Sequence, residues 1–285
     1  MREFLRLLKW ELFRMFARPR TYIGFAVFLL VEGLVLFLFT RPSVQRGMKE
    51  WIENVAGGFD EYFSALTLGF ILVAGTVFLL GAPFLALVSG DIVAKESEDG
   101  NLRLLLARPV SRLRLLMVKY LSCQIYALSL FLFIASSALI VGMIERGWGG
   151  GYVVWTPEMP RVSIFDWGQG MRRFFLMPFF LVVSYLPLTS FAFMLSCMRI
   201  KPAAATIITL AVVMADFVLA NFPLFPLFKE YRDWFVTPRM QMWVYSQYQD
   251  IPWPQVFENW AWLVGIGLTG FVLGWMCFER RDIKS

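Results

Sequence analysis

The chain contains no histidine, so it lacks the side chain that most often serves as a metal ligand or general base. The chain is therefore not expected to be a zinc hydrolase, a Ser/His hydrolase or a histidine proton relay, because each of these depends on a histidine. The three cysteines, Cys123, Cys197 and Cys277, lie in apolar stretches without a Cys-x-x-Cys pair, so we expect buried small side chains and neither a disulfide framework nor a metal cluster. Charge is also scarce, at 17% of residues against 58% hydrophobic. A water-soluble fold could not bury so much apolar surface.

What the chain does contain is long apolar stretches, each able to cross a hydrocarbon core that needs roughly 20 residues. They predict an all-α, polytopic membrane protein that forms one transmembrane domain over residues 1–285. Pro83 in the second stretch and Pro178 and Pro187 in the fourth predict kinks. The six stretches are 21–40, 63–89, 115–143, 173–198, 203–222 and 257–278.

The basic residues indicate the orientation of these spans. If both chain ends lie on one side, 17 of the 27 Lys and Arg residues lie on that side, which the positive-inside rule makes cytoplasmic. Nine of the 11 tryptophans lie in or beside the opposite loops, as amphipathic rings at the outer interface would. We therefore expect a multi-pass protein of the cell's inner (plasma) membrane. The net charge of +6 is explained by this orientation, so no nucleic-acid partner is expected.

Residues 1–20 have the pattern of an amphipathic helix lying on the membrane surface. Six basic and two acidic residues exclude a cleavable signal peptide here. The Arg18-Pro19-Arg20 sequence ends the helix and lets the chain turn into the bilayer. The apolar residues predicted to face the membrane share one arc: Phe4, Leu5, Leu8, Leu12, Met15 and Phe16.

The segment 90–112, between the second and third spans, reads as two short helices separated by a break. Asp91 and Lys95 lie four residues apart on one helix face. Gly100 favours a helix end, Asn101 can cap the next turn, and Ser111 can cap the third span after Pro109 has stopped the second short helix. The pattern predicts a compact elbow on the cytoplasmic side.

This elbow resembles the cytoplasmic loop of the type-2 permease family of ABC exporters. In that family an Asp, a Glu, a Gly, a Leu-rich turn and a Pro-x-Ser-Arg run follow in order, with a Thr after the Gly where this chain has Asn101, which keeps a capping side chain. The local match covers about 30 residues, and the helix count and orientation agree over the whole chain. The matching positions are Asp91, Glu96, Gly100, Leu102, Leu105, Leu106, Pro109, Ser111, Arg112 and Lys119.

The resemblance implies a coupling helix that seats in a nucleotide-binding subunit and transmits its motion to the spans. Acidic residues at one end of the segment and Arg103, Arg108 and Arg112 at the other would dock by complementary charge. The alternative is a solvated amphipathic loop on the lipid headgroups. The residues predicted to couple are Asp91, Glu96, Glu98, Asp99, Gly100, Leu102, Leu105, Pro109 and Arg112.

No G-x-x-x-x-G-K-[ST] motif occurs, so the chain is not expected to bind ATP in that manner or to be an enzyme. No cofactor is expected in this chain. The resemblance implies that ATP and Mg²⁺ are bound by two separate ATPase subunits. It also implies a second permease copy or a related permease beside this one in the bilayer. The predicted function is thus the permease subunit of an ATP-binding cassette exporter.

Two carboxylates, Glu32 and Asp216, fall inside predicted spans, where an unpartnered charge costs very roughly 2–3 kcal/mol. They either line a translocation pathway or are paired or neutral groups that fix helix packing; Lys119 is the one candidate partner in this chain. They also support an alternative function, an ATP-independent channel or half-size secondary carrier. A third reading, an intramembrane enzyme, lacks a catalytic constellation. In the outer loop 223–256, the family resemblance implies short re-entrant helices and the aromatic content alone implies interfacial anchoring.

Overall fold

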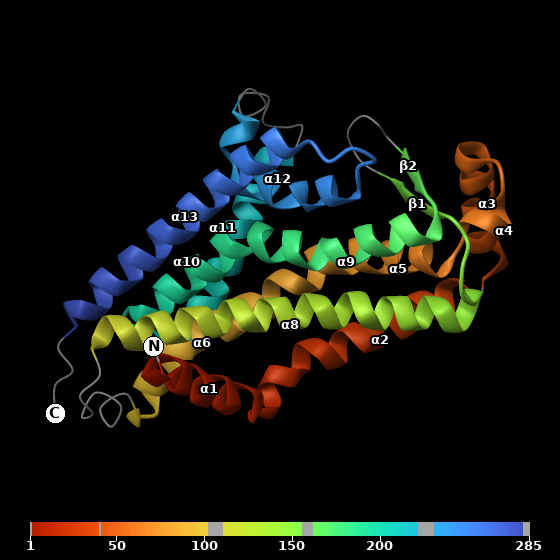
Figure 1. Ribbon diagram of the computed structural model, residues 1–285. Helices are drawn as coiled ribbons and strands as arrows, with labels where there is room; N and C mark the ends of the chain where they lie inside the picture. Colours follow the sequence, from red (N-terminus) through yellow and green to blue (C-terminus); the bar gives the residue numbers. More distant parts are fainter. Residues whose placement is uncertain (1, 40, 102–110, 156–161, 222–230, 282–285) are drawn as a thin grey trace.

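The computed structural model describes residues 2–39, 41–101, 111–155, 162–221 and 231–281. Apart from one short hairpin, the regular structure of these residues is helical, which confirms the expected all-α membrane fold (Figure 1). Five helices or helix pairs are long and apolar enough to cross a membrane: Pro19–Phe39, Arg112–Arg146, Trp167–Cys197, Pro202–Asn221 and Trp253–Glu279. The bent pair Ala65–Thr76 and Leu79–Glu98 makes a sixth if it is one span.

Each predicted stretch coincides with one of these elements. The first is α2 (Ile23–Phe39), entered through the 3-10 turn η1 (Pro19–Tyr22). The third is α8 (Arg112–Arg146), which at about 52 Å is much longer than a hydrocarbon core of about 30 Å. The fifth is α11 (Pro202–Asn221) and the sixth α13 (Trp253–Glu279).

Two spans are interrupted, and prolines mark both breaks. The second consists of α5 (Ala65–Thr76), the π-type turn η2 (Val77–Gly81) and α6 (Ala82–Glu98), bent by 48° with Pro83 in the first turn of α6. The fourth divides into α9 (Trp167–Ser184) and α10 (Leu186–Cys197), with Pro187 in the first turn of α10. Pro178 lies inside α9, which continues past it. Prolines break helices where the missing N–H and the ring displace the preceding turn.

The N-terminal helix α1 (Arg2–Phe16) packs against α8, at the same end of the bundle as the end of α13 (Figure 1). The predicted membrane-facing arc is only partly exposed. Met15 is buried and Leu12 and Phe16 pack against the core, whereas Trp10 and Phe13 are 64% and 67% exposed. The arc prediction was wrong on this point because one flank of α1 faces the protein.

The opposite end carries regular elements in segments that hydropathy alone assigns to loops. They are α3 (Pro42–Ala56), α4 (Phe59–Tyr62) and an antiparallel hairpin of β1 (Tyr152–Trp155) and β2 (Val162–Phe165), in which Tyr152 pairs with Phe165 (Figure 1). Pro42 opens α3, and Gly57, at φ +82°, closes it. This pairing of an initial proline with a terminal glycine is a recognisable helix signature.

The described residues between the last two spans form three short helices: η4 (Arg232–Trp234), α12 (Val236–Met240) and η5 (Gln241–Gln247). Gln247 fixes η5 to the core, because its Oε1 accepts from Tyr152 Oη at 2.7 Å and its Nε2 donates to the Arg173 carbonyl at 3.0 Å. The outer loop is therefore helical over these described residues and tied to α9 and β1.

Close helix contacts depend on small residues, as is common in membranes. A side chain at Gly142 of α8 would collide with the backbone of Ala65 at the start of α5. On α13, Gly267 and Gly270 face Ser190 of α10. These contacts hold α5 against α8 and α13 against α10.

Candidate functional site

Four charged side chains meet where α1, α6 and α8 converge; we call them the charge cluster: Glu11, Arg14, Glu96 and Lys119. The Lys119 Nζ lies 2.8 Å from Glu11 Oε1 and 2.7 Å from Glu96 Oε2, and it also donates to the Ile92 carbonyl at 3.3 Å. Arg14 contacts Glu11 at 3.0 Å and forms an ion pair with Glu96. Two cations thus face two carboxylates across three helices.

The centre of the cluster is buried, although charged residues normally stay in water, while Arg14 at its edge is 36% exposed. Lys119 is 0% and Glu96 1% exposed. Burial raises the pKa of the Glu11 carboxyl, but the Lys119 and Arg14 charges lower it more, so its pKa lies below the ordinary 4.5. Glu11 is therefore ionised at neutral pH. Removing one member of such a cluster leaves an uncompensated buried charge, which makes each member structurally important.

A second ion pair joins the start of the first span to α6. The Arg20 guanidinium lies 2.7 Å from Asp91 Oδ2, while Lys95 pairs with Glu98 and Asp99, at 3.4 Å each. The Asp91–Lys95 pairing suggested by their spacing is therefore not formed, because η1 brings a closer cation to Asp91.

Residues 90–98, predicted as the first short helix of the elbow, instead continue the second span, because α6 runs without a break to Glu98. Beyond α6 the elbow is described only at its two ends. Gly100 adopts φ +72° after α6, and Ser111 Oγ accepts from the Arg114 N–H at 3.3 Å to cap α8, both as predicted. Arg112 is held by the end of α13, donating to the carbonyl of Glu279 at 2.9 Å. Among the predicted coupling residues, Leu102, Leu105 and Pro109 lie outside the described residues.

Of the predicted docking charges, Arg103 and Arg108 lie outside the described residues, and the others divide into two groups. Glu98 and Asp99 have side chains that are 48% and 39% exposed, and their partner Lys95 is itself 38% exposed. Asp91 and Glu96 face inward and are paired within this chain, and Arg112 is occupied by carbonyls. A direct electrostatic contact with a partner is thus open to Glu98 and Asp99, whereas Asp91 and Glu96 hold helices together.

The two intramembrane carboxylates have different surroundings. Glu32 is 2% exposed; Ser137 Oγ donates to its Oε1 at 2.7 Å, and its Oε2 has no hydrogen-bond partner among the described residues. Asp216 accepts from the backbone N–H of Val236 at 3.2 Å and of Thr237 at 2.7 Å. It therefore holds the start of α12 against α11. Lys119 neutralises neither, because it is bound within the charge cluster.

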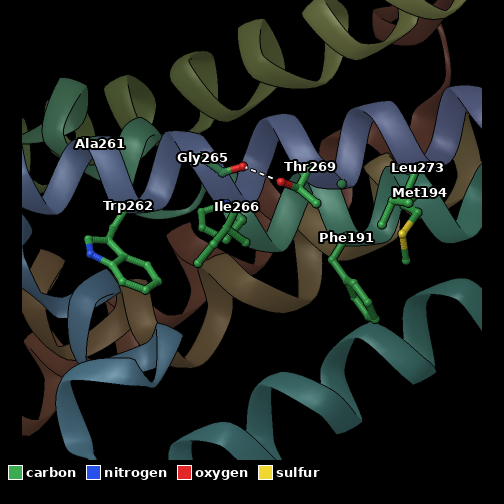
Figure 2. Close-up of a pocket in the computed structure, with 10 residues that line it drawn as sticks. Phe191, Met194, Ala261, Trp262, Gly265, Ile266, Thr269 and Leu273 are labelled. Carbon is green, nitrogen blue, oxygen red and sulfur yellow. Dashed lines mark hydrogen bonds between the residues drawn. The ribbon is translucent and has the colours of Figure 1, made fainter.

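A groove of about 680 Å³ runs along the surface between α10 and α13 (Figure 2). Its walls include Phe191 and Met194 of α10 and Ile266 and Leu273 of α13. Within the described part of the chain, no group of three or more Cys, Asp or Glu side chains is arranged to hold a metal ion. Three features of the described residues are candidate sites: the charge cluster, the buried Glu32 carboxyl and this groove.

Sequence reasoning named Glu96 and Lys119 as motif positions but missed their pairing with Glu11 and Arg14. One local signal was present: Lys119 lies well inside an apolar stretch, and a lysine in such a place needs a partner. The partners themselves come from distant segments, so local spacing could not identify them.

Helix lengths and hydropathy define this chain as a multi-pass membrane protein. Comparison with family models then places it: residues 66–284 match the family described as "Protein of unknown function (DUF2705)", and the chain belongs to that family. It is also similar to a Bacillus subtilis (strain 168) protein named "Uncharacterized protein YhcI", with 27% identity over 113 residues. That match covers 38% of this chain and 36% of the length of the relative.

Proposed function

We propose that the chain is the membrane-spanning permease subunit of an ATP-binding cassette exporter. A separate ATPase subunit, present in two copies, binds ATP and Mg²⁺ and moves the elbow within the segment 90–112. A second permease, identical or related, completes the pathway in the inner membrane, and both ends of this chain lie on the cytoplasmic side.

The observation that supports the proposal best is the charge cluster beside the elbow. Glu96 lies at the end of α6, Lys119 near the start of α8, and Arg14 on α1, so one ion-pair network joins the two helices that flank the elbow to a third helix. A force applied to the elbow would displace all three helices together, because separating them would break the buried ion pairs that join them. Glu98 and Asp99 supply negative charge for the ATPase on the exposed side of the turn.

The test is co-purification of the chain with the ATPase encoded beside it. Glu98→Lys combined with Asp99→Lys should release the ATPase, whereas Glu53→Lys, an equally exposed carboxylate on α3 at the other end of the bundle, should retain it. These positions are preferable to Glu96 and Arg112, whose reversal would disturb the fold itself. Equal retention by the elbow and α3 variants would contradict the proposed docking site.

A second candidate is an ATP-independent channel or half-size secondary carrier, and one observation favours it. Glu32 is a buried carboxyl with one oxygen unpartnered among the described residues, as a proton or cation site would have. Asp216, in contrast, is bonded to the α12 backbone. Proteoliposomes containing only this chain separate the two functions: a carrier transports without nucleotide and loses transport in Glu32→Gln, whereas a permease subunit alone stays inactive.

A further inference from the structure

The groove between α10 and α13 is lined mainly by apolar side chains. Trp262, Ile266, Phe191 and Met194 project to the same side, as Figure 2 shows. The one hydroxyl among the lining side chains, that of Thr269, donates to the Gly265 carbonyl at 2.9 Å. The groove therefore presents hydrocarbon rather than hydrogen-bonding groups, and its natural occupant is an apolar chain.

The length of the groove along α13 is close to the thickness of the hydrocarbon layer in one leaflet of a bilayer. It extends from Ala261 to Leu273 on α13, a rise of about 18 Å along the helix. Half of a hydrocarbon core is about 15 Å thick. Since α10 and α13 both belong to spans, the open side of the groove faces the position of lipid tails.

A cation lies at the end of the groove nearest α12. The Arg239 guanidinium is stacked over the Trp262 ring, 4.8 Å from its centroid. Arg239 Nε donates to the Asp233 carbonyl at 2.7 Å, and its two terminal nitrogens have no partner among the described residues. Asp216 is not a partner of these nitrogens, because its carboxylate accepts hydrogen bonds from the N–H groups at the start of α12. An arginine fork whose terminal donors have no partner in the described part of the chain fits a phosphate group.

We propose that this groove binds one phospholipid of the surrounding bilayer. Its acyl chain lies between α10 and α13, and its phosphate accepts hydrogen bonds from Arg239. Glu258 is exposed and lies four residues before Trp262 on α13, so it places a negative charge near the same end of the groove. The site therefore recognises the phosphate group and does not require a headgroup with a net negative charge. This inference does not depend on the proposed transport function.

Native mass spectrometry of the full chain tests it, with phosphatidylethanolamine or phosphatidylglycerol added to delipidated protein in detergent. The wild type should retain one phospholipid per chain. Gly265→Leu should lower retention about tenfold, because Gly265 lines the groove and faces open space, so a leucine fills it without a clash. Gly33→Leu is the matched control: it places the same side chain in open space on α2, and should retain the lipid.

The headgroup contact has its own pair of variants. Arg239→Gln should lower retention about tenfold, since it removes charge-assisted hydrogen bonds, whereas Arg232→Gln, an exposed cation in the preceding short helix, should not. Equal retention by Gly265→Leu and Gly33→Leu would overturn the proposal. So would a loss of dimer mass in Gly265→Leu with the lipid count unchanged, because a second copy of the chain would then occupy the groove.

Discussion

At the scale of single residues, the unusual feature is full burial of Lys119 and Glu96 in a helix-rich membrane protein. A buried ion pair adds little stability over a well-packed apolar pair, yet removing one partner is costly. The cluster therefore acts less as a source of stability than as a constraint on how α1, α6 and α8 are arranged. Any arrangement that separates them leaves a charge without a partner.

Glu96→Gln should destabilise the protein by about 3 kcal/mol, because Lys119 and Arg14 would then share one carboxylate in a buried site. Thermal denaturation of the detergent-solubilised protein measures the effect. Glu98→Gln, two residues away but about half exposed, should change stability by less than about 1 kcal/mol. Similar losses of stability from both substitutions would show that the destabilisation does not come from the charge cluster.

The lowered pKa of Glu11 predicts how the stability of the folded protein depends on pH. Its pKa is lowered in the folded protein, so the unfolded chain binds more protons than the folded one as the pH falls. The stabilisation from Glu11 is fully present above about pH 4.5 and is lost as pH falls through the folded pKa. Melting temperatures recorded from pH 7 to pH 3 should fall less steeply for Glu11→Gln than for the wild type. A steeper fall of the melting temperature in the variant would contradict a lowered pKa of Glu11 in the folded protein.

At the scale of helices, packing of α5 on α8 depends on one glycine. Gly142→Ala should cost about 1–3 kcal/mol, since the added methyl group meets the rigid backbone of Ala65 rather than a movable side chain. Gly33→Ala adds the same group in open space on α2 and should be neutral or slightly stabilising. The midpoint of thermal aggregation in detergent compares the two. A harmless Gly142→Ala would mean that α5 and α8 are farther apart.

The helices differ in how far they could be predicted from sequence. The spans were predictable because a hydrocarbon core requires about 20 apolar residues, a property that each segment carries locally. The break at Pro187 and the caps at Gly100 and Ser111 were also local. The helix α3 has mixed polarity, so hydropathy missed it, although Pro42 and Gly57 mark its ends. The inward orientation of the Glu96 side chain could not be predicted, because its partners Arg14 and Lys119 come close only in the folded chain.

At the scale of the whole molecule, the start of α1, the end of α6, the start of α8 and the end of α13 lie together, and α3 and the hairpin lie at the other end (Figure 1). The basic residues follow the same division, which is the distribution that orients membrane proteins. Transport driven by a cytoplasmic ATPase requires this end to face the cytoplasm. The orientation is therefore the property on which the proposed function depends most.

Cysteine labelling tests that orientation directly. Glu98→Cys should be protected from a membrane-impermeant maleimide in intact cells and react in inverted vesicles, whereas Glu53→Cys should show the opposite pattern, because both side chains are exposed but at opposite ends. Cys123 and Cys197 are buried and only Cys277 is partly accessible, so the wild type, or a Cys277→Ser background, sets the baseline. Labelling of Glu98→Cys in intact cells would place the elbow outside, where no ATP-driven partner could engage it.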